Sequence, residues 1–476
     1  MNDYKSSFFA SSLRFFIEKR RFFVIAIAIL LFLIILNLPL PQGLTSEGRS
    51  AIAVFVLCLT FWVTAVIPLQ ITSLLAIVLL PVLNIMTSSE AYALFGNKAV
   101  FFILGAFILA AAVMSSGLST RLALLVLNRF GNSPLQLLSS LFLVTALFSH
   151  FISEHAVAAM IFPITLEIAR ELKLQPSKSS YAKAIFIAPA WGCIIGGIGT
   201  FLGGARNPLA VEILYESTGS YIGFFEWIKA AFPIVFINLL FGFLILLLFF
   251  RIDIKDTSPA KKNLEKKIKV LGKMTQREKL ISILMLATIT AWMFFSKTIG
   301  IANIAIIAVV LVFLFKLAKW KDVEENVNWG IILMYGGAIC LGFALEKSGA
   351  ALWIANFFIG NYIKSPFWLI VIIAAVSLYL TEGISNSAVV AIMMPLGISL
   401  AKQFGIDARV MTFAIAIPSG LAFCLPMSTP ATAIAYSSGY VNIKDMVLPG
   451  FILTIISLLN VILISKIYWP FIGLIY

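Results

Sequence analysis

The segment "FSHFISEHAVAAMIFP" (Phe148 to Pro163) holds three ionisable side chains, His150, Glu154 and His155, within an otherwise apolar run. Ionisable groups inside hydrophobic segments are costly, and they are typical of ion or substrate pathways. A glutamate between two histidines also occurs in zinc hydrolases, but there the histidines lie four residues apart, whereas His150 and His155 lie five apart and are the only 2 histidines. The spacing therefore argues against a zinc hydrolase, and we expect His150 to be a hydrogen-bonded histidine rather than a ligand.

The composition of the whole chain explains the apolar surroundings of these residues. Hydrophobic residues make up 61% of the 476 residues and charged residues 12%, with a mean hydropathy of +1.03, whereas soluble proteins are about half apolar and a quarter charged. We therefore expect an all-α polytopic membrane protein with about 11 transmembrane helices of roughly 20 residues each. Apolar runs that approach or reach this length include Phe22 to Leu38, Ala51 to Ile67, Ala230 to Phe250 and Leu448 to Ile464.

The net charge of +14 is concentrated between the apolar runs. Segment 251–280 carries ten basic and four acidic residues, and a further group, Lys316, Lys319 and Lys321, follows the next two apolar runs. Basic loops of polytopic membrane proteins face the cytoplasm, so we expect the N-terminus and this linker to be cytoplasmic. We therefore expect the basic residues to set the orientation of the chain in the membrane, and we expect no nucleic-acid partner.

The chain contains an internal repeat. The stretch "ISEHAVAAMIFP" (152–163) aligns with "ISNSAVVAIMMP" (384–395) at an offset of 232, and "GAFILAAAVMSSG" aligns with "GAICLGFALEKSG" at the same offset. The sequence therefore predicts two related halves, 1–250 and 281–476, joined by the basic linker 251–280. Two-half repeats are typical of secondary transporters, in which inverted halves place a binding site near the membrane midplane.

Each half contains an interrupted apolar helix. Pro134 and Pro366, which are related by the same offset, open apolar stretches that end in a short polar segment, and this pattern predicts re-entrant hairpins near 134–153 and 366–385. We expect the next helices to begin at Ala156 and Ala388. A broken helix leaves free N–H groups that suit an anion and free carbonyls that suit a cation.

Four segments, "ISNSAVVAIMMP", "LAFCLPMSTPATA", "WVTAVIPLQITSLL" and "NWGIILMYGGAICLGFALEKSG", together resemble the divalent anion/sodium symporter family, whose members carry dicarboxylates, citrate or sulfate. The similarity covers nearly the whole chain in the expected order. The resemblance implies two inverted repeats, each with a Ser-Asn-Thr signature at a hairpin tip and a small-residue loop behind it. It also implies a homodimer in which a transport domain moves against a scaffold domain, as in an elevator.

In the second half the resemblance is close. The signature reads Ser385-Asn386-Ser387, and its partner loop, 424–433, includes Thr429 and Pro430. The resemblance implies that all five of these residues bind substrate. It further implies a sodium ion bound by Thr381, Ile384, Asn386 and Ser428.

The first half departs from the family pattern. Its signature reads Ser153-Glu154-His155, and its partner loop, 196–208, reads Gly203-Gly204-Ala205-Arg206-Asn207 where the family usually has Gly-Thr-Pro-Pro-Asn. By position, the implied substrate-binding residues are Ser153, Glu154, His155, Gly204, Arg206 and Asn207, and the implied sodium ligands are Ser149, Ser153, Glu154 and Gly203. A carboxylate repels an anionic substrate unless it is protonated, bound to sodium or paired, and Arg206 is available to pair with it.

Three hypotheses for Glu154 stay open. It ligates sodium with Ser149, Ser153 and the Gly203 carbonyl; or it carries a proton in place of sodium, with His155 titrating beside it; or it forms a fixed network with Arg206 and His155 that replaces the first sodium. A second acid, Glu382, lies three residues before the second signature, and we expect it to be a salt-bridge partner within the hairpin.

We therefore expect a secondary active transporter in the cytoplasmic (inner) membrane that carries a small divalent anion by an elevator mechanism. A sodium-coupled C4-dicarboxylate carrier is the first expectation, because two separated groups of donors match two carboxylates. The alternatives are a proton-coupled carrier or an exchanger, with sulfate, a tricarboxylate or another acid as substrate. An intramembrane hydrolase would need a nucleophile with a base or a metal cluster, and a channel would not need two halves with broken helices.

Overall fold

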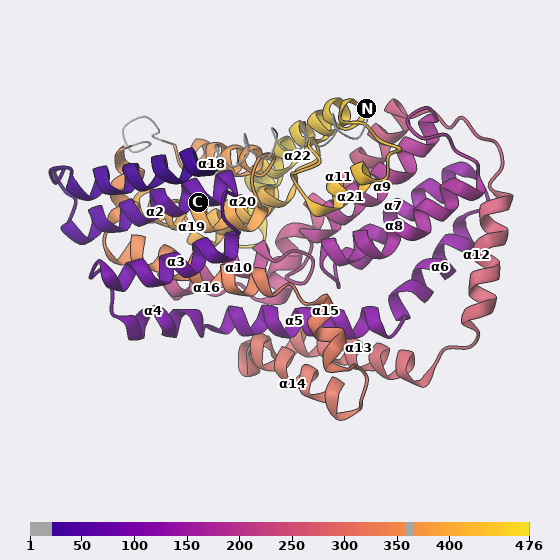
Figure 1. The fold of residues 1–476 in the computed structure, drawn as a ribbon, viewed down its shortest axis with the longest axis horizontal. Coiled ribbons are helices and arrows are strands. Elements are labelled where there is room, and N and C mark those ends of the chain that lie inside the picture. The colour runs from indigo at the N-terminus through magenta and orange to yellow at the C-terminus, as the bar shows by residue number, and fades with distance from the viewer. Residues whose placement is uncertain (1–20, 358–364, 476) are drawn as a thin grey trace, which may run out of the picture.

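The computed structural model describes residues 21–357 and 365–475, and all regular elements among them are helices (Figure 1). This confirms the predicted all-α class. The first half contains the helix Arg21–Asn37, α2 (Ser46–Thr64), α3 (Leu69–Val82), α4 (Ser88–Phe95), α5 (Lys98–Ser115), α6 (Leu118–Phe130), α7 (Pro134–Ser149), α8 (Glu154–Glu171), α9 (Ser180–Gly197), α10 (Arg206–Thr218) and α11 (Phe224–Phe249). The linker and the second half contain α12 (Ser258–Leu271), α13 (Gln276–Ile299), α14 (Ile301–Leu314), α15 (Trp320–Asn326), α16 (Trp329–Lys347), α17 (Ala350–Ala355), α18 (Pro366–Leu380), α19 (Asn386–Phe404), α20 (Ala408–Ala416), η2 (Pro418–Gly420), α21 (Pro430–Ser437) and α22 (Ile443–Phe471).

The lengths and compositions of these helices fit a multi-pass membrane protein. Among the described residues, seven segments are long and apolar enough to cross a membrane: Ser46–Thr64, Ser88–Ser115, Phe224–Phe249, Gln276–Ser296, Trp329–Lys347, Asn386–Phe404 and Ile443–Phe471. Shorter apolar helices include Arg21–Asn37, Leu69–Val82, Pro134–Ser149, Ile301–Leu314 and Pro366–Leu380. The total of about 11 spans stays a prediction. Residues 1–20, which belong to the N-terminal segment expected to face the cytoplasm, lie outside the described residues.

The two predicted hairpins are formed by equivalent pairs of helices. Helix α7 begins at Pro134, ends at Ser149 and is followed after a short turn by α8, while α18 begins at Pro366 and is followed in the same way by α19. With 16 residues, α7 is only about 24 Å long, shorter than the roughly 30 Å of a hydrocarbon core. The predicted proline starts are therefore confirmed, and each hairpin extends through the helix after its tip.

Both of those following helices begin two residues earlier than the sequence suggested. Helix α8 begins at Glu154 rather than Ala156, and α19 begins at Asn386 rather than Ala388. The preceding serines, Ser153 and Ser385, have a non-helical backbone with ψ of 140° and 135°, so the next residue already takes the first helical position. The second residue of each signature therefore lies at a helix N-terminus, where the helix dipole favours negative charge.

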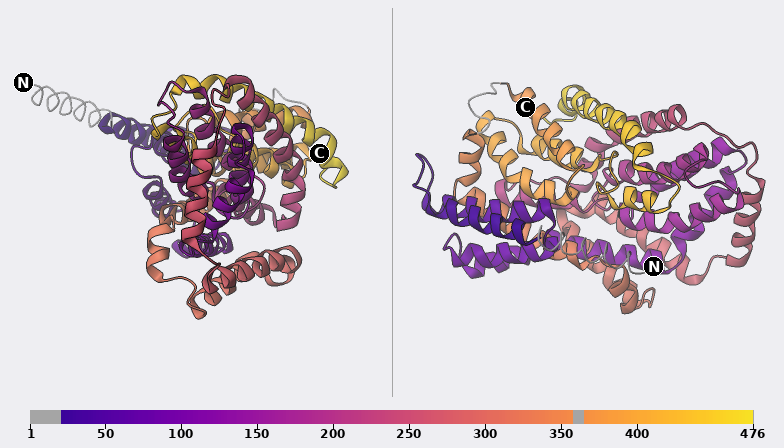
Figure 2. Two further views of the ribbon diagram at one scale, coloured as in Figure 1. Left: turned by 90° about the vertical axis from the view of Figure 1, so that its right-hand side faces the viewer. Right: turned by 45° about the horizontal axis from the view of Figure 1, so that its top comes forward.

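The helices of the two hairpins lie in two groups, one at each end of the molecule (Figure 1). Helices α6, α7, α8 and α9 lie at one end of the molecule, and α2, α3 and α4 lie at the other, together with α16, α18 and α19 (Figure 1). Helices α5 and α10 run through the middle, and α13 and α14 lie on the outside of α5 (Figures 1 and 2). The tips of both hairpins thus come from opposite ends of the molecule towards its centre.

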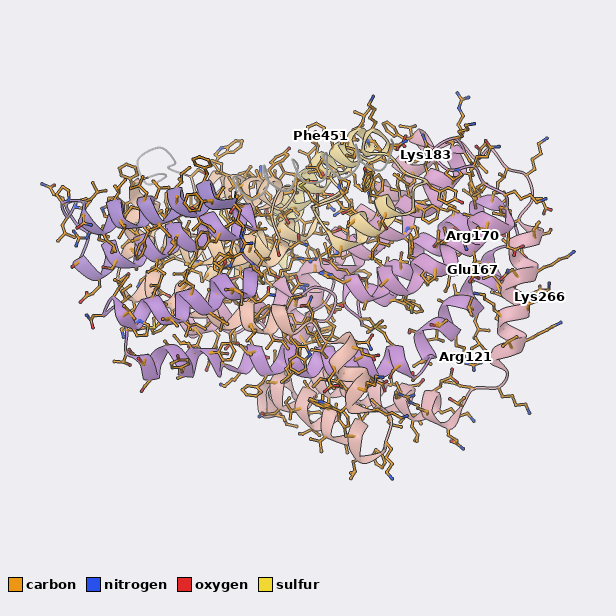
Figure 3. All side chains as sticks on the ribbon, in the orientation of Figure 1. Arg121, Glu167, Arg170, Lys183, Lys266 and Phe451 are labelled. Carbon is orange, nitrogen blue, oxygen red and sulfur yellow. The ribbon has the colours of Figure 1, made fainter. Side chains whose placement is uncertain are left out.

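The basic linker is folded rather than extended, because α12 packs along the ends of α6 and α8 (Figures 1 and 3). Arg121 of α6 is buried, and its Nε donates to Glu278 Oε1 over 2.7 Å while its Nη1 donates to the Gly272 carbonyl over 2.7 Å. On the surface Lys267 of α12 pairs with Glu167 of α8. The linker is therefore anchored to the first half through α12 and through the segment that follows it.

Candidate functional site

The two hairpin tips meet at the centre of the protein. Asn386 Nδ2 donates to Glu154 Oε1 over 3.5 Å, and these two residues are separated by 232 positions, which is the offset of the repeat. Equivalent positions of the two halves are therefore in contact. This is the arrangement expected of two opposed repeats around a central site.

A cavity of about 790 Å³ lies beside this contact. From the predicted site residues it is lined by Glu154, His155, Arg206, Ile384, Ser385, Asn386, Ser387, Ser428, Thr429 and Pro430. Its other wall comes from α2, α3 and the start of α16 and includes Trp62, Thr64, Gln70 and Asn328. The structure therefore brings most of the predicted residues of both signatures into one cavity, which also has a wall that the sequence did not reveal.

The remaining predicted residues lie elsewhere. Ser153, Gly203 and Gly204 line a neighbouring cavity of about 240 Å³, which shares His155 with the large one. Asn207 is fully buried outside the lining of both cavities, because its Nδ2 donates to the carbonyls of Gly197 and Thr200 over 2.9 and 2.7 Å. Asn207 thus holds the partner loop in shape instead of facing the cavity.

The partner loops are shorter than predicted. Helix α10 begins at Arg206, inside the predicted loop 196–208, and α21 begins at Pro430, inside the predicted loop 424–433. In the second loop the reason is local, because the Thr429 side chain accepts the Thr432 N–H over 3.2 Å and caps the helix. Residues beyond these starts are therefore helical.

At the second-half tip, Thr381 Oγ1 donates to Asn386 Oδ1 over 2.6 Å and lies 2.8 Å from the Ser419 carbonyl oxygen. Three oxygens therefore come together in the buried interior. Oxygen atoms are the ligands that hard cations prefer. Thr381 and Asn386 belong to the predicted sodium set, whereas Ser419 was missed because nothing in the sequence indicates that η2 approaches this tip. The chemistry of this tip fits a sodium ion.

At the first-half tip, Glu154 and Arg206 form a buried ion pair. Arg206 Nη1 lies 3.3 Å from both carboxylate oxygens, and each residue is only 1% exposed. His155 Nδ1 lies 3.8 Å from Glu154 Oε1. His150 points elsewhere, with its Nδ1 2.7 Å from the Ala146 carbonyl, as expected of a hydrogen-bonded histidine. The arrangement of Glu154, Arg206 and His155 matches the geometry of the fixed-network hypothesis.

Three glycines make room for this ion pair. A Cβ added at Gly197 would lie 2.6 Å from Glu154 Oε2, one at Gly204 would lie 2.5 Å from Arg206 Nη1, and one at Gly420 would lie 2.2 Å from Arg206 Nη2. Contacts this short do not occur, so a side chain at any of these positions would displace the pair. Since Gly420 belongs to the second half, the guanidinium is enclosed by both halves.

Glu382 has a role that the sequence did not reveal. Its carboxylate accepts the N–H groups of Phe423, Cys424 and Leu425 and the hydroxyls of Ser428 and Thr454, with Ser428 Oγ at 2.6 Å. The expected salt bridge is wrong for the described part of the chain, because these donors, and no basic side chain, surround the carboxylate. Glu382 therefore fixes the second partner loop against the second hairpin.

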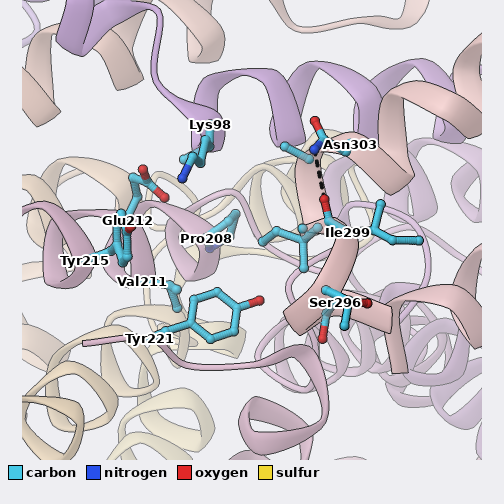
Figure 4. Close-up of a pocket in the computed structure, with 14 residues that line it drawn as sticks. Lys98, Pro208, Val211, Glu212, Tyr215, Tyr221, Ser296, Ile299 and Asn303 are labelled. Carbon is cyan, nitrogen blue, oxygen red and sulfur yellow. Dashed lines mark hydrogen bonds between the residues drawn. The ribbon is translucent and has the colours of Figure 1, made fainter. Parts of the chain in front are cut away.

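A further cavity of about 480 Å³ lies between α5, α10, α13 and α14, away from both signatures (Figure 4). Its polar lining includes Glu212, which is 8% exposed, and Lys98, whose Nζ lies 5.2 Å from the centre of the Tyr215 ring. No signature residue lines it. The central cavity is therefore the better candidate for a substrate site.

An all-helical, multi-pass membrane protein with two opposed hairpin tips around a central cavity has the architecture of a secondary transporter. The profile of the family described as "Sodium:sulfate symporter transmembrane region" matches residues 19–475. The chain therefore belongs to the divalent anion/sodium symporter family, whose members are transporters rather than enzymes.

Two curated relatives illustrate the similarity. The "Sodium-dependent dicarboxylate transporter SdcS" of Staphylococcus saprophyticus is 30% identical over 91% of this chain and 89% of its own length. The protein of the same name from Staphylococcus aureus strain RF122 is 29% identical over 93% of this chain and 90% of its own length. These relatives support the conclusion that the chain is a transporter of divalent anions, and they contradict the hydrolase alternative.

Solved structures show the same fold at much lower identity. The Alcanivorax borkumensis YdaH transporter matches with a TM-score of 0.52 and 12% identity, over 80% of this chain and 88% of that one. Neisseria gonorrhoeae MtrF, titled as one of a class of antimetabolite efflux pumps, matches with a TM-score of 0.56 and 13% identity, over 94% of both chains. At these identities the likeness concerns the fold alone.

Proposed function

We propose that this protein is a sodium-coupled transporter of C4-dicarboxylates. The observation that carries the proposal is the central cavity of about 790 Å³, in which polar groups of both hairpin tips converge. Relatives named as sodium-dependent dicarboxylate transporters support the same substrate class. A dicarboxylate has two charged ends, and the cavity offers groups from two separate halves to receive them.

The second half supplies the main anion-binding groups in this proposal. Helices α19 and α21 begin at Asn386 and Pro430, both of which line the cavity, so two helix N-termini with their positive dipole ends border it. Ser387 adds a hydroxyl at the same wall. At the first half the charge of Glu154 is compensated by Arg206, which leaves His155 and the guanidinium edge as the groups beside the second carboxylate.

Sodium would be held at the second-half tip by Thr381, Asn386 and the Ser419 carbonyl, with Ile384 and Ser428 nearby in the predicted set. Because Asn386 both joins this oxygen group and lines the cavity, an ion there would order the residue that faces the substrate. This shared residue is the physical basis for coupling the ion to the substrate.

The proposal includes a movement of one domain against another and a dimeric assembly. The substrate cavity lies between the hairpin tips and a wall of Trp62, Thr64, Gln70 and Asn328. We assign the hairpins and their loops to a transport domain and this wall to a scaffold domain, past which the transport domain slides as an elevator. The protein would work as a homodimer in the cytoplasmic membrane, with its N-terminus and the 251–280 linker on the cytoplasmic side.

Uptake into proteoliposomes tests this function. An inward sodium gradient is expected to drive accumulation of radiolabelled succinate, and potassium in place of sodium is expected not to. Competition with excess sulfate and citrate distinguishes a dicarboxylate site from the alternatives. Absence of sodium-driven uptake of succinate, sulfate and citrate would contradict the proposal, as would a proton gradient that drives uptake equally well without sodium.

Replacing Ser387 by alanine is expected to raise the KM for succinate about 10- to 100-fold, because a hydrogen bond to a charged group contributes roughly 1.5 to 3 kcal/mol. Ser387 is buried at the cavity wall. The matched control is Ser437→Ala, since Ser437 is exposed at the far end of α21 and donates to the Ile434 carbonyl. Equal KM values for the two variants would remove Ser387 from the site.

A further inference from the structure

The two hairpin tips, although equivalent in the repeat, are held together by different chemistry. Position 149 is the repeat equivalent of 381, and 154 is the equivalent of 386. In the second half the hydroxyl of Thr381 bonds to Asn386, whereas in the first half the buried hydroxyl of Ser149 bonds to no described residue and Glu154 bonds to Arg206 instead. The described part of the first tip therefore lacks the side-chain bond that joins the equivalent positions of the second tip.

Two of the groups predicted to bind a first sodium, the Gly203 carbonyl and the Glu154 carboxylate, are engaged in other contacts. The Gly203 carbonyl accepts the Glu154 N–H over 3.0 Å, and both Glu154 carboxylate oxygens lie 3.3 Å from Arg206 Nη1. A sodium ion on this carboxylate would be a second positive charge within a few ångströms of a buried guanidinium, where repulsion is little screened. The residues of the first tip therefore do not fit a sodium ion.

The Arg206 guanidinium lies where a bound cation would also neutralise Glu154 and connect the neighbouring segments. It neutralises Glu154 at the start of α8, and it joins the first hairpin to its own partner loop, because Arg206 begins α10. The close approach of Gly204 and Gly420 to its nitrogens encloses it between both halves. A covalently attached charge of this kind orders the tip at all times, whereas an imported ion does so only when bound.

We propose that Arg206 takes the place of one coupling cation, so that the chain couples substrate movement to sodium at the second-half tip alone. This inference rests on the proposed function, since it concerns the number of ions that accompany the substrate. It predicts a transporter whose first tip is preassembled and whose sodium dependence comes from Thr381 and Asn386.

The sodium dependence of succinate uptake tests this directly. A Hill coefficient cannot exceed the number of coupled sites, so one sodium site predicts a value of about 1 for this chain. The reversal potential of uptake in proteoliposomes, measured across several sodium gradients, gives the stoichiometry independently. A coefficient near two, together with two sodium ions per succinate, would overturn the inference. Absence of any sodium-driven transport would instead refute the proposed function.

Equivalent serine and threonine positions provide a matched pair of variants. Thr381→Ala is expected to raise the sodium concentration for half-maximal uptake at least tenfold, and Ser149→Ala is expected to leave it within about twofold, because only Thr381 belongs to an oxygen group that fits sodium. A similar shift in Ser149→Ala would show that the first tip binds the ion.

A double variant tests whether a sodium response can be restored at the first tip. The double change Glu154→Asn/Arg206→Thr removes both charges and restores the family's amide at the tip. If Arg206 stands in for a cation, this variant is expected to acquire a steeper sodium dependence, or to gain thermal stability in sodium over potassium beyond that of the unmodified protein. An unchanged sodium response in a folded double variant would contradict the inference.

Discussion

Glu154→Gln is expected to lower the free energy of unfolding by about 3 to 5 kcal/mol, and Glu154→Gln/Arg206→Gln is expected to recover most of that loss. Removing one partner of a buried ion pair leaves an uncompensated charge, whereas removing both leaves none. Glu154 and Arg206 are each 1% exposed, so neither charge is available to water when its partner is lost. Thermal and denaturant unfolding of the purified variants, followed in detergent, measure the effect.

Another glutamate of the same helix provides the control. Glu167 of α8 pairs with Lys267, but both side chains are more than a third exposed, and an exposed pair contributes only about 0 to 1 kcal/mol. Glu167→Gln is therefore expected to change stability little. If Glu154→Gln were as stable as Glu167→Gln, or if the double variant were less stable than either single variant, the pair would not hold the tip together.

Several features of the site could be predicted from the sequence because they are local or repeated. Pro134 and Pro366 mark helix starts through their fixed backbone angle, and their common offset showed that the two hairpins are equivalent. The pairing of Glu154 with Arg206 followed from electrostatics, since an acid buried in a membrane protein needs a partner and few basic residues lie in the apolar segments.

Other features depend on how distant segments approach one another. The Ser419 carbonyl joins Thr381 across 38 positions, and Gly420 encloses Arg206 from the opposite half, although neither residue has a side chain that would attract attention. The far wall of the cavity, with Trp62 and Asn328, comes from two segments that carry the family resemblance, but nothing in their sequence places them beside the hairpin tips. Backbone groups and small residues carry no signal of tertiary contact, so only the folded structure reveals these roles.

Glu382 is the clearest residue of this kind, because its chemistry was visible in the sequence but its partners were not. An acid three residues before a signature suggested a basic partner. In the structure three consecutive backbone N–H groups and two hydroxyls fill its hydrogen-bonding capacity. The three N–H groups belong to a loop of the second half. Because this loop has no helical hydrogen bonds of its own, its buried N–H groups need another acceptor, and the carboxylate of Glu382 supplies it.

Glu382→Ala is expected to reduce the rate of succinate uptake at least 100-fold. Hydrogen bonds to a charged group contribute about 1.5 to 3 kcal/mol each, so losing several of them costs the ordered loop more than the roughly 2.7 kcal/mol that corresponds to a factor of 100. The loop carries Ser428 and Thr429 into the cavity, and disorder there would scatter the substrate-binding groups. Initial uptake rates, normalised to the amount of reconstituted protein, measure the loss.

Graded variants separate this ordering role from a loss of folding. Glu382→Gln keeps one acceptor oxygen and is expected to lose about tenfold, while Thr454→Val removes one hydroxyl donor, at 3.3 Å from Oε1, and is expected to lose less than that. Thr412→Val makes the same chemical change on α20, where the hydroxyl donates to the Ala408 carbonyl, and is expected to retain full uptake. Full activity in Glu382→Ala would show that the loop keeps its shape without the carboxylate, and equal losses in Thr454→Val and Thr412→Val would attribute the effect to general destabilisation.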